Sequence, residues 1–271
     1  MNGELAPTAY PSVATGMLGP TLAVARFQLG RLVSRPRLLL AAVGAVFPAA
    51  VMLAVRRTVA DGLDRDLAVV MIDALVVEAV CMLGLLVTIC PVVADELERG
   101  TWVHVAVRPR GRRALLLGTY LAAVVWAGGV ALVAAILAIM AAGVDRPLPL
   151  IGMFAALTTL SVVGRAALFS LPAVILPKRA LVASVVVALV VEYLAGFIPA
   201  IVNQATVSLR LRSLLVVWMG WKQRLPVEVQ LLVDPQPAWM QIGAVGVLAA
   251  VLLLVAATIL DYRQFPPSTE I

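Results

Sequence analysis

Long apolar stretches alternate with short charged connections along the chain, and six of these stretches are long enough to cross a bilayer as helices. A membrane span needs about 20 mostly apolar residues, because the hydrocarbon core is about 30 Å thick and a helix rises about 1.5 Å per residue. The runs show no polar alternation, which favours helices over a β-barrel. The predicted spans are 38–55, 67–94, 114–144, 148–177, 180–202 and 239–260.

The segment before the first span has a different pattern. Over 21–36, apolar residues recur at helical spacing while Arg26, Arg31 and Arg35 occupy other faces, which predicts a basic amphipathic helix at the membrane interface, with a break at Pro36. An alternative is that these arginines only anchor the first span and set its topology. The predicted organisation is a loose tail (1–20), this interfacial helix (21–36), a transmembrane domain (37–263) with a cytoplasmic loop (95–113) and an outer loop (203–238), and a C-terminal tail (264–271).

Composition supports the membrane assignment. The 271 residues are 62% hydrophobic and only 13% charged, whereas a soluble domain carries about 25% charged residues. We therefore do not expect a soluble enzyme or a nucleic-acid binder, and we assign the net charge of +6 to contact with the bilayer. Connections on the side of the two termini hold 12 Lys and Arg and those on the other side hold 8, which places both termini in the cytoplasm of a multi-pass cell-membrane protein.

The connection after the second span, DELERGTWVHVAVRPRGRR, is the most informative segment. Asp95, Glu96 and Glu98 crowd the start of a short predicted helix, where the positive end of the helix dipole favours carboxylates. The basic run from Arg108 to Arg113 would hold the segment on the cytoplasmic lipid surface. The alternative is a solvated connector whose charges only enforce topology.

The order of these features resembles the permease subunits of ABC-2 type transporters. The interfacial basic helix, two spans, an E-x-E-x-G-T stretch, an R-P-x-x-R-x-x-L-L-x-G-x-Y run from Arg108 to Tyr120 and four further spans carry the resemblance. Trp102 and His104 depart from the aliphatic residues usual in that family. The residues that the resemblance assigns to the coupling loop are Asp95, Glu96, Glu98, Arg99, Gly100, Thr101, Arg108, Pro109 and Arg112.

The resemblance implies that the chain is the membrane subunit of an exporter, pairs with a second permease copy and docks on a separate cytoplasmic ABC ATPase. A P-loop needs Gly-Lys followed by Ser or Thr, and neither lysine, Lys178 nor Lys222, stands in that motif. We therefore expect no enzymatic activity and no cofactor bound by this chain itself, with ATP-Mg held by the partner ATPase. One histidine and two cysteines also make a zinc site improbable.

Four charges lie inside the predicted spans: Asp73, Glu78, Arg165 and Glu192. A charge at the bilayer centre costs about 2.5–3.5 kcal/mol on insertion scales, so these side chains should face the bundle interior, each other or water. Our hypothesis is that Arg165 pairs with Glu192 or Glu78 as a structural ion pair. The alternative is that the four residues line a polar substrate or proton path.

The outer connection contains the apolar segment from Leu209 to Trp221, which either lies on the outer surface or re-enters the membrane. In the family that the chain resembles, this position caps the outer exit, so Trp218 and Trp221 are candidate gate residues. Aromatic residues of an interfacial belt are the alternative.

Two other functions compete with the transporter subunit. An ion-coupled secondary transporter would use Glu78, Arg165 and Glu192 as its machinery, although no internal repeat is apparent. A non-catalytic membrane assembly subunit would need neither an ATPase nor a transport path. A pathway lined by Ala, Val and Leu suits many apolar substrates, so the sequence names none.

Overall fold

The chain forms a bundle of helices, with no strand in the parts that the structure describes. The computed structural model describes residues 16–59, 63–98, 110–194, 206–223 and 236–263. Five helices in these ranges are long and apolar enough to cross a membrane, which makes the chain a multi-pass membrane protein. They are α2 (Arg35–Thr58), a composite helix (Arg65–Glu96), α7 (Gly111–Ala142), α8 (Pro147–Ile175) and α12 (Ala238–Tyr262).

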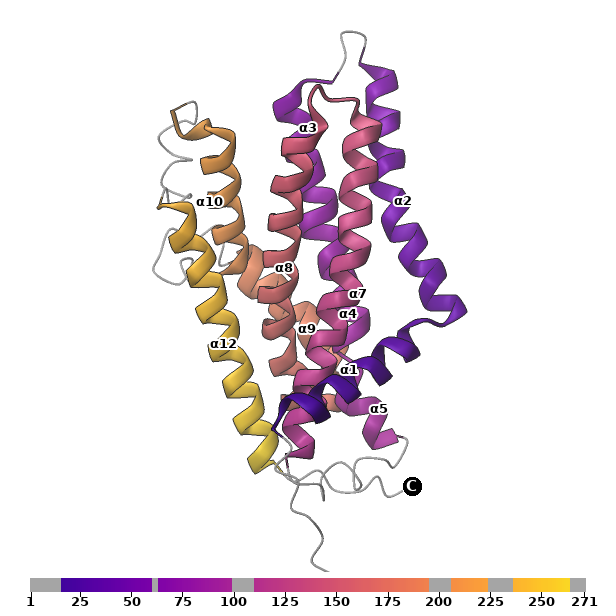
Figure 1. Cartoon of the computed structure of the whole chain (residues 1–271), viewed down its shortest axis with the longest axis vertical. Helices are drawn as coiled ribbons and strands as arrows, with labels where there is room; N and C mark the ends of the chain where they lie inside the picture. The colour runs from indigo at the N-terminus through magenta and orange to yellow at the C-terminus, as the bar shows by residue number, and fades with distance from the viewer. Residues whose placement is uncertain (1–15, 60–62, 99–109, 195–205, 224–235, 264–271) are drawn as a thin grey trace, which may run out of the picture.

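The second predicted span, 67–94, is this composite helix. It consists of α3 (Arg65–Ile72), the π-helix η1 (Asp73–Val80) and α4 (Cys81–Ile89), and after a turn at Cys90 and Pro91 it continues as α5 (Val92–Glu98). The acidic residues thus lie on a short helix, as the sequence predicts, but they do not crowd its start: Asp95 ends the first turn and Glu98 is the last residue. The helix begins earlier than predicted because Val92 and Val93 continue it directly after the turn at Pro91. Figure 1 shows α5 at the same end of the bundle as α1.

The region after α8 differs from the prediction. A single-turn 3-10 helix, η2 (Pro177–Arg179), leads into α9 (Ala180–Val187) and a second π-helix, η3 (Ala188–Leu194). The predicted fifth span, 180–202, is therefore helical as far as Leu194, and its remaining residues lie outside the described ranges. The next described elements are α10 (Val207–Met219) and the 3-10 helix η6 (Trp221–Gln223).

Helix α10 shows that 203–238 is not simply an outer loop. Its apolar face, which includes Leu211 and Leu214, is buried, and the helix packs against α8 and α12. This packing favours the alternative in which the segment re-enters the bundle. The physical reason is that α10 consists largely of Leu and Val, whose side chains are shielded from water only when the helix packs within the bundle.

The interfacial helix is also shifted from its predicted bounds of 21–36. Helix α1 spans Leu18–Leu32, and Ser34 then adopts an extended conformation before α2 begins at Arg35. Pro36 lies in the first turn of α2, where its missing N–H leaves no helical hydrogen bond unmade. The break therefore precedes Pro36 by two residues, and Arg35 belongs to the first span.

Arginines join several helices at the α1 end of the bundle. Helix α7 begins at Gly111, so Arg112 and Arg113 belong to its first turn and not to the predicted loop 95–113. Arg112 donates hydrogen bonds to the carbonyls of Leu260 (3.2 Å) and Asp261 (2.8 Å), the last turn of α12, where a cation is electrostatically favoured. Arg263 in turn donates to Val174 O of α8 at 3.1 Å. The start of α7 and the ends of α8 and α12 therefore meet at one end, where Figure 1 also places α1.

The core lies where α4, α7 and α8 pack together. Helix α7 contributes a stripe of small residues, Ala127, Ala131, Ala134 and Ala138, all fully or almost fully buried. Small residues let membrane helices approach closely, because van der Waals packing replaces the hydrophobic driving force in lipid. Helices α2 and α12 bury far less of their surface and form the periphery.

Gly118 marks the closest approach of α1 to α7. A Cβ atom there would lie 2.7 Å from Val24 Cβ and 2.8 Å from the backbone oxygen of Thr21. We expect Gly118→Ala to lower stability by about 1–3 kcal/mol through overpacking, although alanine is the better helix former. Thermal unfolding of the purified protein in detergent measures this effect.

Gly128→Ala on the same helix is the matched control. Nothing lies within 4 Å of a Cβ atom at Gly128, so the same substitution should leave stability unchanged or raise it by up to about 1 kcal/mol. Equal effects of the two substitutions would contradict the close packing of α1 on α7.

Candidate functional site

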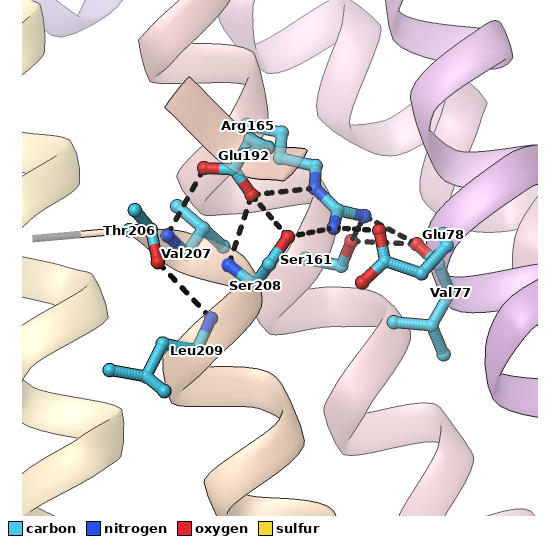
Figure 2. Close-up of polar contacts among 9 residues, drawn as sticks. All are labelled: Val77, Glu78, Ser161, Arg165, Glu192, Thr206, Val207, Ser208 and Leu209. Atoms are coloured by element: carbon cyan, nitrogen blue, oxygen red, sulfur yellow. Dashed lines mark hydrogen bonds and ion pairs between the residues drawn. The ribbon is translucent and has the colours of Figure 1, made fainter. Parts of the chain in front are cut away.

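Arg165 lies at the centre of a polar network inside the bundle. Its side chain is fully buried, and it lies on α8 about ten residues, or about 15 Å, from that helix's C-terminal end. The network combines residues of η1, α8, η3 and α10, and Figure 2 shows the guanidinium of Arg165 between Glu78 and Glu192. We call Val77, Glu78, Ser161, Arg165, Glu192 and Ser208 the Arg165 network.

The guanidinium forms hydrogen bonds to three helices. Its Nη2 donates to Glu78 Oε2 on η1 and to Ser208 Oγ on α10, the latter at 2.9 Å. Its Nη1 donates to Val77 O at 2.6 Å and to Ser161 Oγ, one helical turn earlier on α8, at 2.8 Å. These contacts offset the high cost of placing a charge in the bundle interior.

Glu192 connects the Arg165 network to the start of α10. Glu192 Oε2 lies 3.5 Å from Arg165 Nε, accepts a 2.5 Å hydrogen bond from Ser208 Oγ and accepts the Ser208 N–H at 3.0 Å. Its Oε1 accepts the Val207 N–H at 3.1 Å. The first N–H groups of a helix lack partners within the helix, so this carboxylate replaces the water that cannot reach them. Thr206 adds a side-chain cap by accepting the Leu209 N–H at 3.3 Å.

Both carboxylates of the Arg165 network lie in π-helical segments. Glu78 belongs to η1 and Glu192 to η3. π-Helical turns are rare, short and frequent at functional sites. A change of either segment between π- and α-helical register would rotate its carboxylate away from Arg165, so the network depends on both segments keeping this geometry.

The predicted pairing of Arg165 is present in the structure and involves both candidate carboxylates, since Arg165 contacts Glu78 as well as Glu192. Asp73, the fourth charge, lies at the start of η1, five residues before Glu78. It is half-buried and takes no part in the hydrogen bonds around Arg165 described here.

A second polar cluster lies at the α1 end, and we call it the Arg31 clamp. Arg31 on α1 donates from Nη2 to Asp95 Oδ2 at 2.9 Å and from Nη1 to Glu96 Oε1 at 3.3 Å, both on α5. The three side chains are largely shielded, with exposures of 17%, 28% and 10%. Phe27 lies beside the Arg31 guanidinium at 5.9 Å. The clamp therefore fixes the amphipathic helix to the acidic segment.

The remaining predicted site residues fall into three groups. Arg112 lies in α7 and contacts the end of α12, not the acidic residues. Trp218 and Trp221 lie at the end of α10 and in η6, away from the Arg165 network, and Trp221 packs against the core. Arg99, Gly100, Thr101, Arg108 and Pro109 lie outside the described residues, and the side chain of Glu98 is not described.

Sequence reasoning missed Ser161, Ser208 and the role of Arg31. Ser161 could have been found, because it precedes Arg165 by four residues and so shares its helix face. Ser208 gave no such signal, since it becomes a partner of Arg165 only when α10 enters the bundle. Arg31 was predicted to contact lipid, and only the packing of α1 beside α5 brings it to Asp95 and Glu96.

No group of three or more His, Cys, Asp or Glu side chains within the described ranges could hold a metal ion. Comparison with known proteins also gives no assignment: no protein-family model matches the chain, and no curated protein matches it significantly.

We expect Arg165→Met to destabilise the protein by about 3–5 kcal/mol, because it leaves Glu78 and Glu192 buried without their cation. The measurement is thermal unfolding in detergent. Arg179→Met, which removes an exposed arginine near the end of the bundle, should change stability by less than about 1 kcal/mol.

A double-mutant cycle separates the contribution of the Arg165–Glu192 ion pair to stability from the other effects of each substitution. Glu192→Gln should cost less in the Arg165→Met background than in the wild type, since the carboxylate has then already lost its partner. Strictly additive losses would contradict the contact between Arg165 and Glu192.

Proposed function

We propose that the chain is the permease subunit of an ABC-2 type transporter, a membrane exporter powered by a separate cytoplasmic ABC ATPase. In this proposal the chain crosses the cell membrane six times, has both termini in the cytoplasm and pairs with a second permease copy. The acidic segment α5 and the connection that follows it dock on the ATPase. ATP-Mg is bound and hydrolysed by the partner.

The observation that carries the proposal is the Arg31 clamp. A coupling segment must transmit the movement of an ATPase to the spans, which requires a firm connection to them. Asp95 and Glu96 provide one, since α5 directly continues the composite span and is joined through Arg31 to α1, the helix that leads into α2. The part of the sequence that resembles the family thus lies in a mechanically connected position.

The path of the chain supports the six crossings. Arginine contacts bring the start of α7 together with the ends of α8 and α12. Helix α12 therefore begins towards the opposite end of the bundle, so the chain between α8 and α12 must return across it once. In this proposal the return is the sixth crossing, made by α9 and η3 together with α10, and Trp218 and Trp221 lie near the outer exit.

The second candidate is an ion-coupled secondary transporter, and the Arg165 network is the observation that favours it. Buried carboxylates paired with an arginine are typical of proton and ion pathways in membrane proteins. Against this role, the carboxylates already accept the hydrogen bonds that Arg165 and the start of α10 supply. We therefore assign the network to positioning α10 inside the bundle.

Co-purification with an ABC ATPase from the same organism, sought first among the genes next to this one, tests the leading proposal. We expect the two proteins to form a complex whose ATP turnover falls at least several-fold in Glu96→Ala/Glu98→Ala. Arg31→Gln should lower turnover in the same way, because it releases α5 from α1. Arg26→Gln, an exposed arginine on the same helix, is the matched control and should leave turnover unchanged.

Transport in proteoliposomes then distinguishes the candidates. An exporter of this type should move substrate only with the ATPase and ATP present, whereas an ion-coupled carrier should respond to an ion gradient without them. Failure of any ATPase to bind, together with gradient-driven transport that Glu78→Gln abolishes, would overturn the permease proposal.

A further inference from the structure

An apolar groove runs along the inner side of α2, apart from the Arg165 network, and its end at Arg37 borders the Arg31 clamp. It has a volume of about 300 Å³, and its walls come from α2, α7 and the composite helix. Figure 1 shows α2 leaning away from α4 and α7 towards its α1 end. Small residues on the facing walls, Ala41, Gly44, Ala79, Gly84 and Ala127, leave the space between the helices unfilled.

Large apolar side chains remain exposed in this groove. Phe47 on α2 is 53% exposed, and Leu83 is 63% exposed although it belongs to the most deeply buried span of the bundle. In a membrane protein such side chains are stable only against hydrocarbon, so the groove has the surface of a site for an acyl chain or another apolar body.

The groove has the length of one lipid leaflet. Its lining on α2 extends from Arg37 to Phe47, ten residues apart, which corresponds to about 15 Å along a helix. That distance is half of the hydrocarbon core, which is about 30 Å thick. An occupant with its polar end at Arg37 would therefore reach the bilayer midplane near Phe47.

Arg37 gives the groove a charged end. Its Nη1 donates a long bond (3.4 Å) to the backbone oxygen of Arg31, and no carboxylate pairs with it among the described ion pairs. The nearby Asp95 and Glu96 are instead held by Arg31. The guanidinium thus keeps donors for an anion at the depth where lipid phosphates lie.

We propose that this groove binds one phospholipid with an anionic headgroup, its phosphate at Arg37 and an acyl chain along Gly44 and Leu83. The matching length, the apolar lining and the single cation at one end all indicate a lipid of the leaflet on the α1 side. A second copy of this chain would satisfy the apolar wall but not the anion site. The inference does not rest on the proposed function, since it needs neither an ATPase nor transport.

The test is native mass spectrometry of the purified full chain in detergent, titrated with phosphatidylglycerol or phosphatidylcholine of identical acyl chains. We expect one phosphatidylglycerol per chain to bind about five-fold more tightly than phosphatidylcholine, the preference that one cation near an anionic lipid gives. Arg37→Gln should remove this preference, because it weakens the binding of phosphatidylglycerol more than that of phosphatidylcholine, whose phosphate is balanced by its own choline cation. Arg35→Gln, an exposed arginine two residues away that does not line the groove, should keep it.

A second variant tests the groove itself. Gly44→Phe fills the space beside Val130, where a Cβ atom has no neighbour closer than 3.9 Å, and should weaken the binding of both lipids at least ten-fold. Ala41→Phe serves the same purpose if Gly44→Phe does not fold. Gly129→Phe, on α7 but outside the groove, is the matched control.

The fluorescence of Trp126, which lines the groove, tests whether the lipid binds at this place. Phosphatidylglycerol with brominated acyl chains should quench part of the tryptophan fluorescence, and Trp126→Phe should remove that part. Equal affinities for the two lipids, unchanged binding in the filled variants, or a stable dimer that excludes lipid from Trp126 would each overturn the proposal.

Discussion

The architecture depends on Arg165, the one cation that is buried among the residues the structure describes. Arg165 lies within the bundle, and its guanidinium can remain there only with anionic and hydrogen-bonding partners around it. Those partners come from three other parts of the chain, namely η1, η3 and the start of α10. The charge therefore specifies which segments meet, because an arrangement that separates any of them leaves an ionised group without compensation.

This requirement accounts for the least regular part of the fold. Helix α10 begins inside the bundle, where its first N–H groups have no water, and Glu192 accepts two of them. The same carboxylate faces Arg165, so one side chain neutralises the cation and caps the helix. Gly164, beside Arg165, provides the room, since Val207 and Val245 approach within 2.9–3.2 Å of where a Cβ atom would lie. The position of α10 is thus determined jointly by the ion pair, the helix cap and the close packing at Gly164.

The α1 end of the bundle is organised by arginines of a different kind. Arg112 and Arg263 bind carbonyls at the ends of α12 and α8, and Arg113 pairs with Asp261 at 2.7 Å, so the ends of distant helices are held together by partly exposed contacts. Arg31 adds α5 to this end through α1. Contacts of this type are individually weak and can exchange partners, whereas those of the interior cannot without large cost. A moving element attached at this end, as the proposed function requires, would therefore leave the Arg165 network intact.

The sequence by itself determined that the chain is a helical membrane protein, because hydrophobic length and low charge are local properties of each segment. It also predicted all five of the spans observed in the described ranges within a few residues, and the pairing of Arg165 with Glu78 or Glu192, because a charge in lipid has few permitted partners. The tertiary structure decided that Arg165 takes both carboxylates, that both lie in π-helical turns, that α10 enters the bundle and that Arg31 binds the acidic helix. These four features depend on which helices become neighbours in the fold. Contacts between helices that are far apart in the sequence leave no periodic pattern in the sequence of either helix, so they cannot be predicted from one segment.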